Sequence, residues 1–290
     1  MPDTATPAAV TPELDRRQRL DAERAAADQL SRLNGALELQ AAVLALLLPA
    51  GSQRAARAWQ IEAEGAPNAQ ALLGHVGHLS GAARLPWFET LVSRMRGQPL
   101  AARQGLLEAT RRVMSARGAV RPIDRLHWLA MRQRLGGACS AGARSAASVD
   151  LSQLPQGDVL AIATYSAFLS RLVPVEPADA TDATATATAP GAAWYDAVMA
   201  PWRDRATLPP CQPPDTDGLV HALQELQAMA WMQRPVLVRG WVTAALQHSR
   251  HGRLGDMAAD ALRLSCSLLD SPLPPELERH HAIAAPELQR

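Results

Sequence analysis

The predicted fold is decided at residues 100–135, where LAARQGLLEATRRVMSA (100–116) is followed by RGAVR (117–121) and PIDRLHWLAMRQRL (122–135). In the first of these segments, side chains on one stripe return at the 3.6-residue period of an α-helix: Leu100, Leu106, Leu107, Thr110, Val113 and Met114. Gly118 suits the turn between two helices because glycine tolerates positive φ. The stretch therefore predicts two helices, over 100–116 and 122–135, joined by a glycine turn.

A second hairpin of the same kind is expected near the C-terminus. Helices are predicted over 235–249 and 254–269, and Gly252 lies in the turn between them. In both hairpins an aliphatic residue follows the glycine at +2 and a core-type residue follows it at +10. The two hairpins thus form a weak internal repeat.

The rest of the chain is also expected to be helical, in segments that proline and glycine separate. The helices are predicted at 13–33, 33–48, 53–64, 68–79, 86–95, 158–172, 192–203 and 217–232. We predict an all-α protein of two helical-repeat lobes, and five regions along the chain: a disordered tail (1–12), an N-terminal lobe (13–136), a linker segment with one helix (137–191), a C-terminal lobe (192–276) and a second tail (277–290). The Ala/Thr/Asp run at 178–190 is predicted to be the flexible part of the linker.

Composition supports helices and excludes some chemistry. The 290 residues are 48% hydrophobic and only 4% aromatic, which disfavours β-rich folds. All 29 basic residues are arginine, because the chain has no lysine. A Walker A phosphate loop and a Schiff-base lysine are therefore both excluded.

The sequence also favours a cytoplasmic location. The N-terminus lacks the basic and apolar regions of a signal peptide. The longest apolar runs, at 41–48 and 159–169, fall short of the ~20 residues of a membrane-spanning helix. Cys139, Cys211 and Cys266 are widely spaced, which fits a reducing compartment.

The two glycine turns and their helices resemble the paired helical repeats of tellurite-resistance TerB-like proteins. More specifically, they are similar to the long C-terminal region of bacterial HtpX-like zinc metallopeptidases. Four stretches in the family's order carry the resemblance, over about residues 30–276: AAVLALLL (41–48), RLPWFE (84–89), the Gly118 turn, and ALR (261–263) running on to LDSPLPP (269–275). The resemblance implies a TerB-like helical fold.

The resemblance does not extend to the peptidase domain. Zinc peptidases of this type place His-Glu-x-x-His on a helix, with the glutamate as base. This motif is absent, and His221 to Glu225 have the wrong order and spacing. The membrane helices of the full peptidases are absent as well. We therefore expect a non-catalytic chain with no catalytic residues.

In the resembling family the turn is Asp-Gly, with a glutamate six residues after the glycine, and this pair suggests a divalent-cation site. Here Arg117 and His251 precede the glycines, and Asp124 and Ala258 occupy the glutamate positions. Arginine repels a cation and alanine offers no oxygen ligand. We therefore expect no metal, no cofactor and no response to divalent ions, while Gly118 and Gly252 keep their role in the turns.

Other candidate residues have structural interpretations. The pairs His75/His78 and His248/His251 have helical spacing but lack a third metal ligand, and His280/His281 are assigned to the tail. Residues around Cys139 lack the glycine and the strand of a nucleophile elbow. Five tryptophans at helical positions are predicted to lie in the core: Trp59, Trp87, Trp128, Trp231 and Trp241.

Charge is distributed unevenly along the chain. Residues 84–134 hold eleven arginines and three acids, whereas residues 150–225 hold ten acids and three arginines. These stretches are solvated faces or binding surfaces, and a basic face of this kind suits anionic lipid or an acidic protein better than nucleic acid. Arg111, Arg112 and Arg125 are the candidate partner-binding residues of this face.

These observations favour a non-enzymatic scaffold or regulatory module that binds another protein near the cytoplasmic face of the membrane. A membrane metallopeptidase is one candidate partner. Two alternatives stay open at this point: a detached accessory subunit of a split zinc metallopeptidase, and a binder of anionic lipid or nucleic acid through Arg84–Arg134. The sequence does not identify the partner, the oligomeric state or the pathway.

Overall fold

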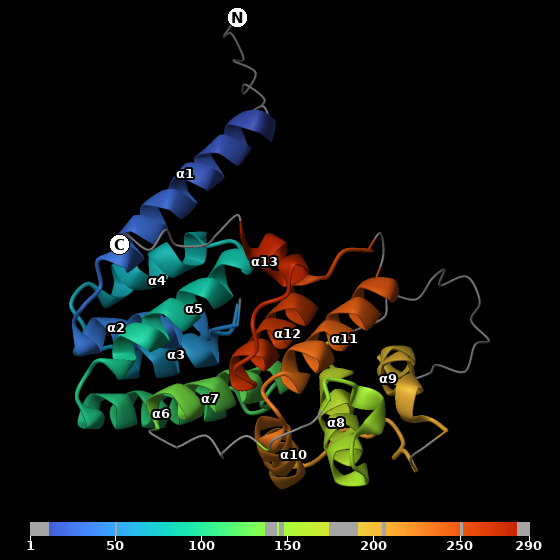
Figure 1. Ribbon diagram of the computed structural model, residues 1–290. Coiled ribbons are helices and arrows are strands. Elements are labelled where there is room, and N and C mark those ends of the chain that lie inside the picture. Colours follow the sequence, from blue (N-terminus) through green and yellow to red (C-terminus); the bar gives the residue numbers. More distant parts are fainter. Residues whose placement is uncertain are drawn as a thin grey trace, which may run out of the picture. The chain divides into compact units, whose positions relative to one another are not determined.

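The computed structural model describes residues 12–49, 51–136, 144, 148–173, 191–204, 207–249 and 252–282 (Figure 1). Within these ranges the secondary structure is helical, with thirteen α-helices and two short 3-10 helices. The predicted all-α class is confirmed. Contacts divide the chain into two compact units, and the boundary falls between residues 116 and 117. We call residues up to 116 the first unit and residues 117–282 the second unit.

The first unit is built around α2, which is buried among the other helices (Figure 1). Seven of the eleven α2 residues are buried, and α3, α4, α5 and α6 pack on them. Trp59 of α3 donates a hydrogen bond from Nε1 to the Ala41 carbonyl at 2.8 Å, which fixes α3 on α2. The helices of this unit are α1 (Pro12–Ser31), α2 (Ala36–Leu46), α3 (Gln53–Glu62), α4 (Ala69–His78), α5 (Gly81–Arg96) and α6 (Leu100–Ser115).

The second unit is built around α8, which is apolar on almost every side. Ten of its fourteen residues are buried, and α9 and α10 pack against it. The Trp241 indole of α11 stacks on Tyr165 with ring centroids 5.4 Å apart and donates to Ser166 Oγ at 3.0 Å. The helices of this unit are α7 (Pro122–Leu135), η1 (Leu151–Gln153), α8 (Gln156–Leu169), α9 (Ala192–Met199), η2 (Ala200–Trp202), α10 (Thr216–Ala228), α11 (Gln233–Gln247), α12 (Asp256–Leu268) and α13 (Pro275–His281).

The division into units differs from the predicted lobes. Helix α7 belongs to the second unit because it packs on α12, although the sequence grouped it with residues 13–136. Helix α8, expected within a linker, is part of the second unit's core. Part of the predicted tail, residues 277–281, lies in α13, where Leu277 and His281 are buried. The Ala/Thr/Asp run at 178–190, residues 1–11 and Cys139 lie outside the described residues.

Candidate functional site

The two predicted turn glycines have left-handed backbone conformations. Gly118 has φ +88° and Gly252 has φ +62°, and a Cβ added at either position would meet no atom within 4 Å. Backbone conformation, rather than space, is therefore what favours glycine at both turns. His251, which precedes the second glycine, lies outside the described residues.

At the first turn, an ion triplet lies where the resembling family has an acidic pair. Asp124 is buried, and its Oδ2 accepts a hydrogen bond from Arg117 Nη1 at 2.9 Å. Its Oδ1 accepts from Arg121 Nη2 at 2.8 Å, and Oδ2 also accepts from the Arg121 backbone N–H, which caps α7. The side chain of Arg117 is itself only 5% exposed. The side chains of Arg117 and Arg121 thus supply the positive charge that faces Asp124.

Burial and charge act in opposite directions on the ionisation of this triplet. Burial raises the pKa of Asp124, but the hydrogen bonds and charges of Arg121 and Arg117 outweigh it, so that the pKa is lowered. Burial also lowers the pKa of the neighbouring His127 to about 4. His127 is therefore neutral at pH 7, and its Nδ1 lies 3.0 Å from the Ile123 carbonyl oxygen.

The predicted basic residues Arg111, Arg112 and Arg125 are divided between the two units. Arg111 and Arg112 are exposed on α6 of the first unit, whereas Arg125 is half-buried on α7 of the second. Arg112 forms a forked ion pair with Glu62, with Nη2 2.8 Å from Oε2 and Nε 2.5 Å from Oε1. The hydrogen bond from Arg112 lowers the pKa of Glu62. Arg112 thus links α6 to α3.

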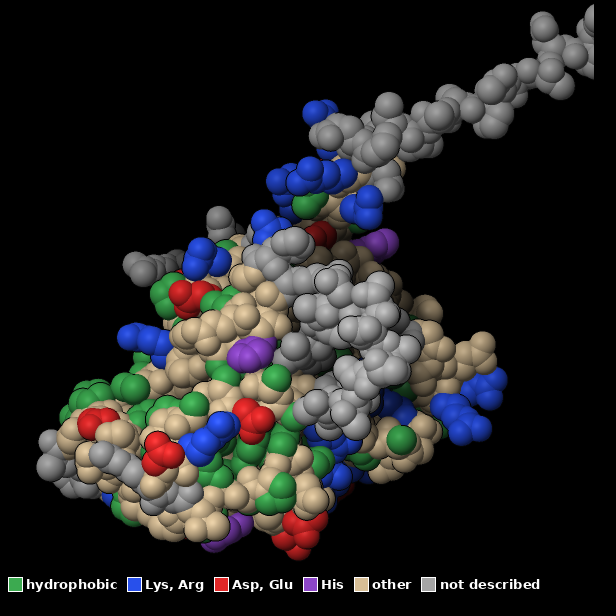
Figure 2. All heavy atoms as spheres, turned by 90° about the vertical axis from the view of Figure 1, so that its right-hand side faces the viewer, with side chains coloured by type: hydrophobic (Ala, Val, Ile, Leu, Met, Phe, Trp, Pro, Cys, Tyr) green, Lys and Arg blue, Asp and Glu red, His purple; other side chains and the backbone are tan. Residues whose placement is uncertain are grey.

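Other arginines of the basic stretch 84–134 also bind within the chain. Arg84 Nη2 donates to carbonyls at the C-terminus of α2, the shortest contact being 3.0 Å to Leu46. Arg94 Nη1 does the same at the C-terminus of α1, with 2.7 Å to the Ser31 oxygen. Arg134 Nη2 donates to Ser267 Oγ at 2.6 Å. Figure 2 shows one face of the molecule, with arginine side chains in blue and acidic side chains in red.

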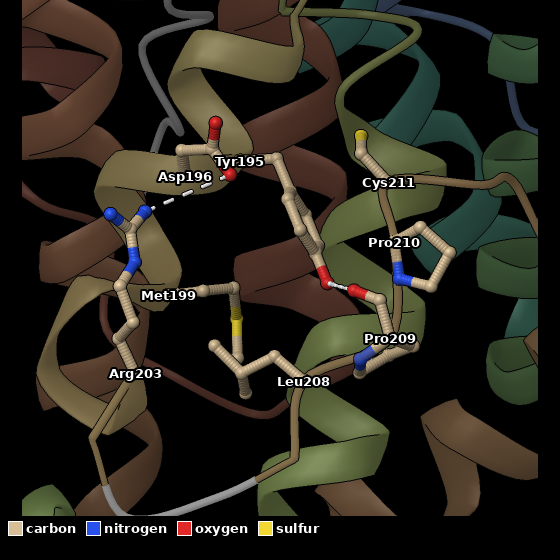
Figure 3. A pocket seen from close by; sticks show the side chains of 8 residues that line it. All are labelled: Tyr195, Asp196, Met199, Arg203, Leu208, Pro209, Pro210 and Cys211. Carbon is tan, nitrogen blue, oxygen red and sulfur yellow. Dashed lines mark hydrogen bonds and ion pairs between the residues drawn. The ribbon is translucent and has the colours of Figure 1, made fainter.

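A cleft of about 320 Å³ lies between α9 and the proline-rich segment at 207–214 (Figure 3). The Tyr195 hydroxyl points at this segment and donates to the Pro209 carbonyl at 2.6 Å. Burial, with Cys211 and Asp196, raises the pKa of Tyr195 to about 12, so the phenol stays protonated as a donor. Cys211 Sγ lies 3.3 Å from Ser170 Oγ. These polar contacts hold the proline-rich segment against the helices.

A second cleft, of about 330 Å³, lies where the turn between α10 and α11 meets residues 148–158. Arg144 and Asp158 line it and form an ion pair of 2.7 Å. Gln233, the first residue of α11, also lines the cleft, and its Nε2 donates to the Ser148 carbonyl at 3.1 Å. This hydrogen bond holds residues 148–150 beside the first turn of α11.

Three exposed apolar residues are close in sequence to residues that line this cleft. Trp231, between the lining residues Ala230 and Gln233, is 71% exposed. Val149 follows Ser148, and Val236 lies in the first turn of α11; they are 45% and 38% exposed. We call these three residues and the cleft of about 330 Å³ the Trp231 surface.

Trp231 is the main correction to the predicted core. Trp59, Trp87 and Trp241 are buried as predicted, and Trp128 is half-buried. The prediction was wrong for Trp231 because this residue lies in the turn between α10 and α11, where no helix covers it. The helix predicted at 217–232 included Trp231, but α10 ends at Ala228, three residues earlier.

Among the residues described, no three His, Cys, Asp or Glu side chains come together as metal ligands. Of the helices described, none combines the length and the hydrophobicity that a bilayer crossing requires.

Comparisons with models of protein families, with curated proteins and with solved structures found no match for this chain. The TerB-like resemblance therefore stays a prediction. The fold places the chain in the class of all-α proteins.

Proposed function

We propose that this chain is a non-enzymatic helical module that binds another protein, and that the Trp231 surface is its docking site. The observation that carries the proposal is the 71% exposure of Trp231, beside 0–3% for five other tryptophans (Trp59, Trp87, Trp194, Trp202 and Trp241). Tryptophan is enriched at the energetic centres of protein interfaces. The nearby residues Ala230 and Gln233 line a cleft that offers a hollow for a side chain of the partner.

Ile61 is equally exposed, at 72%, but it supports docking less well. Single exposed aliphatic residues are common on protein surfaces, and isoleucine lacks the interface enrichment of tryptophan. Binding of lipid or nucleic acid through Arg84–Arg134 has less support, because Arg84, Arg94, Arg112, Arg117, Arg121 and Arg134 all make contacts within the chain. Widely spaced cysteines favour the cytoplasm as the place where the module acts.

Site-specific photo-crosslinking in cells tests this proposal. A benzophenone amino acid replaces Val236 in one variant and Gln247, about 17 Å further along α11, in the control. We expect a discrete protein adduct from position 236 that Trp231→Ala removes. Failure of position 236 to form such an adduct, or an equal adduct from position 247, would contradict the proposed docking site.

A further inference from the structure

Acidic side chains outnumber basic ones at the Trp231 surface. Asp150 and Asp158 line the cleft, and Glu225 Oε2 lies 3.5 Å from Arg144, the one arginine in the cleft's lining. Three carboxylates thus accompany one guanidinium group. The stretch 150–225, which supplies all three, carries ten acids and three arginines in total.

The two arginine side chains near this surface form hydrogen bonds and ion pairs within the chain. Arg144 donates to the Ala228 carbonyl at 3.2 Å as well as to Asp158, and so covers the C-terminus of α10. Arg234, one residue after Gln233, is buried and donates to the carbonyls of Gln227, Met229 and Leu269. These carbonyls are the negative ends of helix dipoles, which offset the arginine charge. The surface therefore presents an excess of negative charge.

Trp231 fits the same kind of ligand. An exposed indole attracts a guanidinium or ammonium group placed over its face, and Val149 and Val236 are exposed apolar residues of the same surface. At about 330 Å³, the cleft lies at the lower end of the ~300–1,000 Å³ range of ligand pockets, so it takes one or two side chains rather than a folded domain.

We infer that the Trp231 surface binds a short basic segment of a partner protein, in which arginine or lysine side chains flank an apolar anchor. The anchor enters the cleft, one cation stacks on Trp231, and another lies near Asp150 and Glu225. This inference rests on the proposed docking function and specifies the chemistry of the partner.

Selection of random dodecapeptides on phage tests the inference with the intact chain. The immobilised chain is the bait, and the Trp231→Ala variant removes peptides that bind elsewhere. A second variant, Val236→Asp, serves as an independent control in case Trp231→Ala fails to fold. Circular dichroism melting checks that both variants are folded. We expect the enriched peptides to carry at least two basic residues next to an apolar one.

The outcomes separate this inference from the proposed function. Peptides that need Trp231 but carry no basic excess would overturn the basic-segment inference and leave the docking function standing. If no selected peptide depends on Trp231 or Val236, both the basic-segment inference and the proposed docking function are overturned.

Binding of one selected peptide, made synthetically, then tests the role of charge. We expect Asp150→Asn combined with Glu225→Gln to weaken its binding about tenfold at low salt, and the effect to shrink at ~0.5 M NaCl. Asp217→Asn is the matched control, because this exposed acid lies on α10 about 16 Å from its C-terminal end. Equal binding by the double variant and the control would contradict the inference.

Discussion

Arginine side chains close the C-termini of several helices in this lysine-free chain. Arg94 covers the end of α1, Arg84 the end of α2, and Arg144 and Arg234 the end of α10. The last carbonyls of a helix have no partner within it, and a cation is favoured at this negative end. A guanidinium group has five N–H donors, so one arginine serves two or three carbonyls at once.

The Arg117–Asp124–Arg121 triplet provides the first prediction at this scale. Asp124→Asn removes the carboxylate charge and leaves the buried Arg117 without its counter-charge, so we expect a loss of about 3 kcal/mol in the free energy of unfolding. Glu108→Gln is the control, since this acid is 69% exposed and 3.9 Å from Arg112, and its loss is expected to cost less than about 0.5 kcal/mol. Urea unfolding of both variants gives the comparison. Equal, small losses would show that the triplet contributes little.

His127 provides a prediction about pH. Its pKa is about 4 in the folded chain and about 6.5 when unfolded, so the unfolded chain binds more protons between these values. Stability therefore falls as the pH falls through this window. We expect the chain to lose about 1–2 kcal/mol more than His127→Gln between pH 7 and pH 5, by urea unfolding. Parallel losses in both proteins would rule out this role of His127.

Divalent ions are the third test at the residue scale. Asp124 accepts from two guanidinium groups, so a cation would have to displace Arg117 or Arg121 to reach it. Millimolar calcium or magnesium is expected to shift the melting temperature by no more than about 1–2 °C, whereas an ion bound at a folded-state site would raise it. A saturable rise of several degrees with one ion per chain would mean that oxygen ligands gather elsewhere.

Among the elements, the sequence predicts helix positions well where apolar periodicity is strong. The helix predicted at 122–135 spans Pro122–Leu135, and the one predicted at 100–116 spans Leu100–Ser115. The helix predicted from Pro86 instead begins at Gly81, because Ala83 and Leu85 add buried residues before the proline. The local sequence pattern predicts these helices because the apolar periodicity agrees with the way the helices pack.

Contacts between residues that are distant in sequence explain why some features of the structure could not be predicted from the sequence. Arg84 and Arg94 bind carbonyls 36–64 residues away, so a count of local charge assigns them to a basic face. Trp231 has the spacing of a core residue, yet exposure in a turn depends on which helices pack above it. The candidate docking surface thus appears only with tertiary structure.

The arginine caps make a prediction about element stability. Arg84→Met keeps the apolar stem but removes the donors to the end of α2, so we expect a loss of about 1.5–3 kcal/mol in the free energy of unfolding. Arg57→Met, on the exposed side of α3, is the control and is expected to change stability by less than about 0.5 kcal/mol. Thermal melting followed by circular dichroism distinguishes them. If both variants melt alike, the cap at α2 does not stabilise the unit.

For the whole molecule, the position of α7 determines where the chain can be divided. Ile123, Leu126 and Met131 of α7 are buried, and α7 packs on α12 in the second unit. We expect a fragment of residues 117–283 to unfold cooperatively and a fragment of residues 137–283 to lose this cooperativity, because the α12 face is then uncovered. Calorimetry of the two fragments makes the comparison. Similar transitions would place the boundary after α7 instead.

Hydrogen–deuterium exchange is the measurement that tests the docking function of the whole molecule most directly. The intact chain is compared with and without the protein captured by crosslinking at position 236. We expect slower exchange at 148–155 and 229–237, the segments of the Trp231 surface, with α6 around Arg111 and Arg112 unchanged. Protection confined to α6, or none at 229–237, would contradict the docking function.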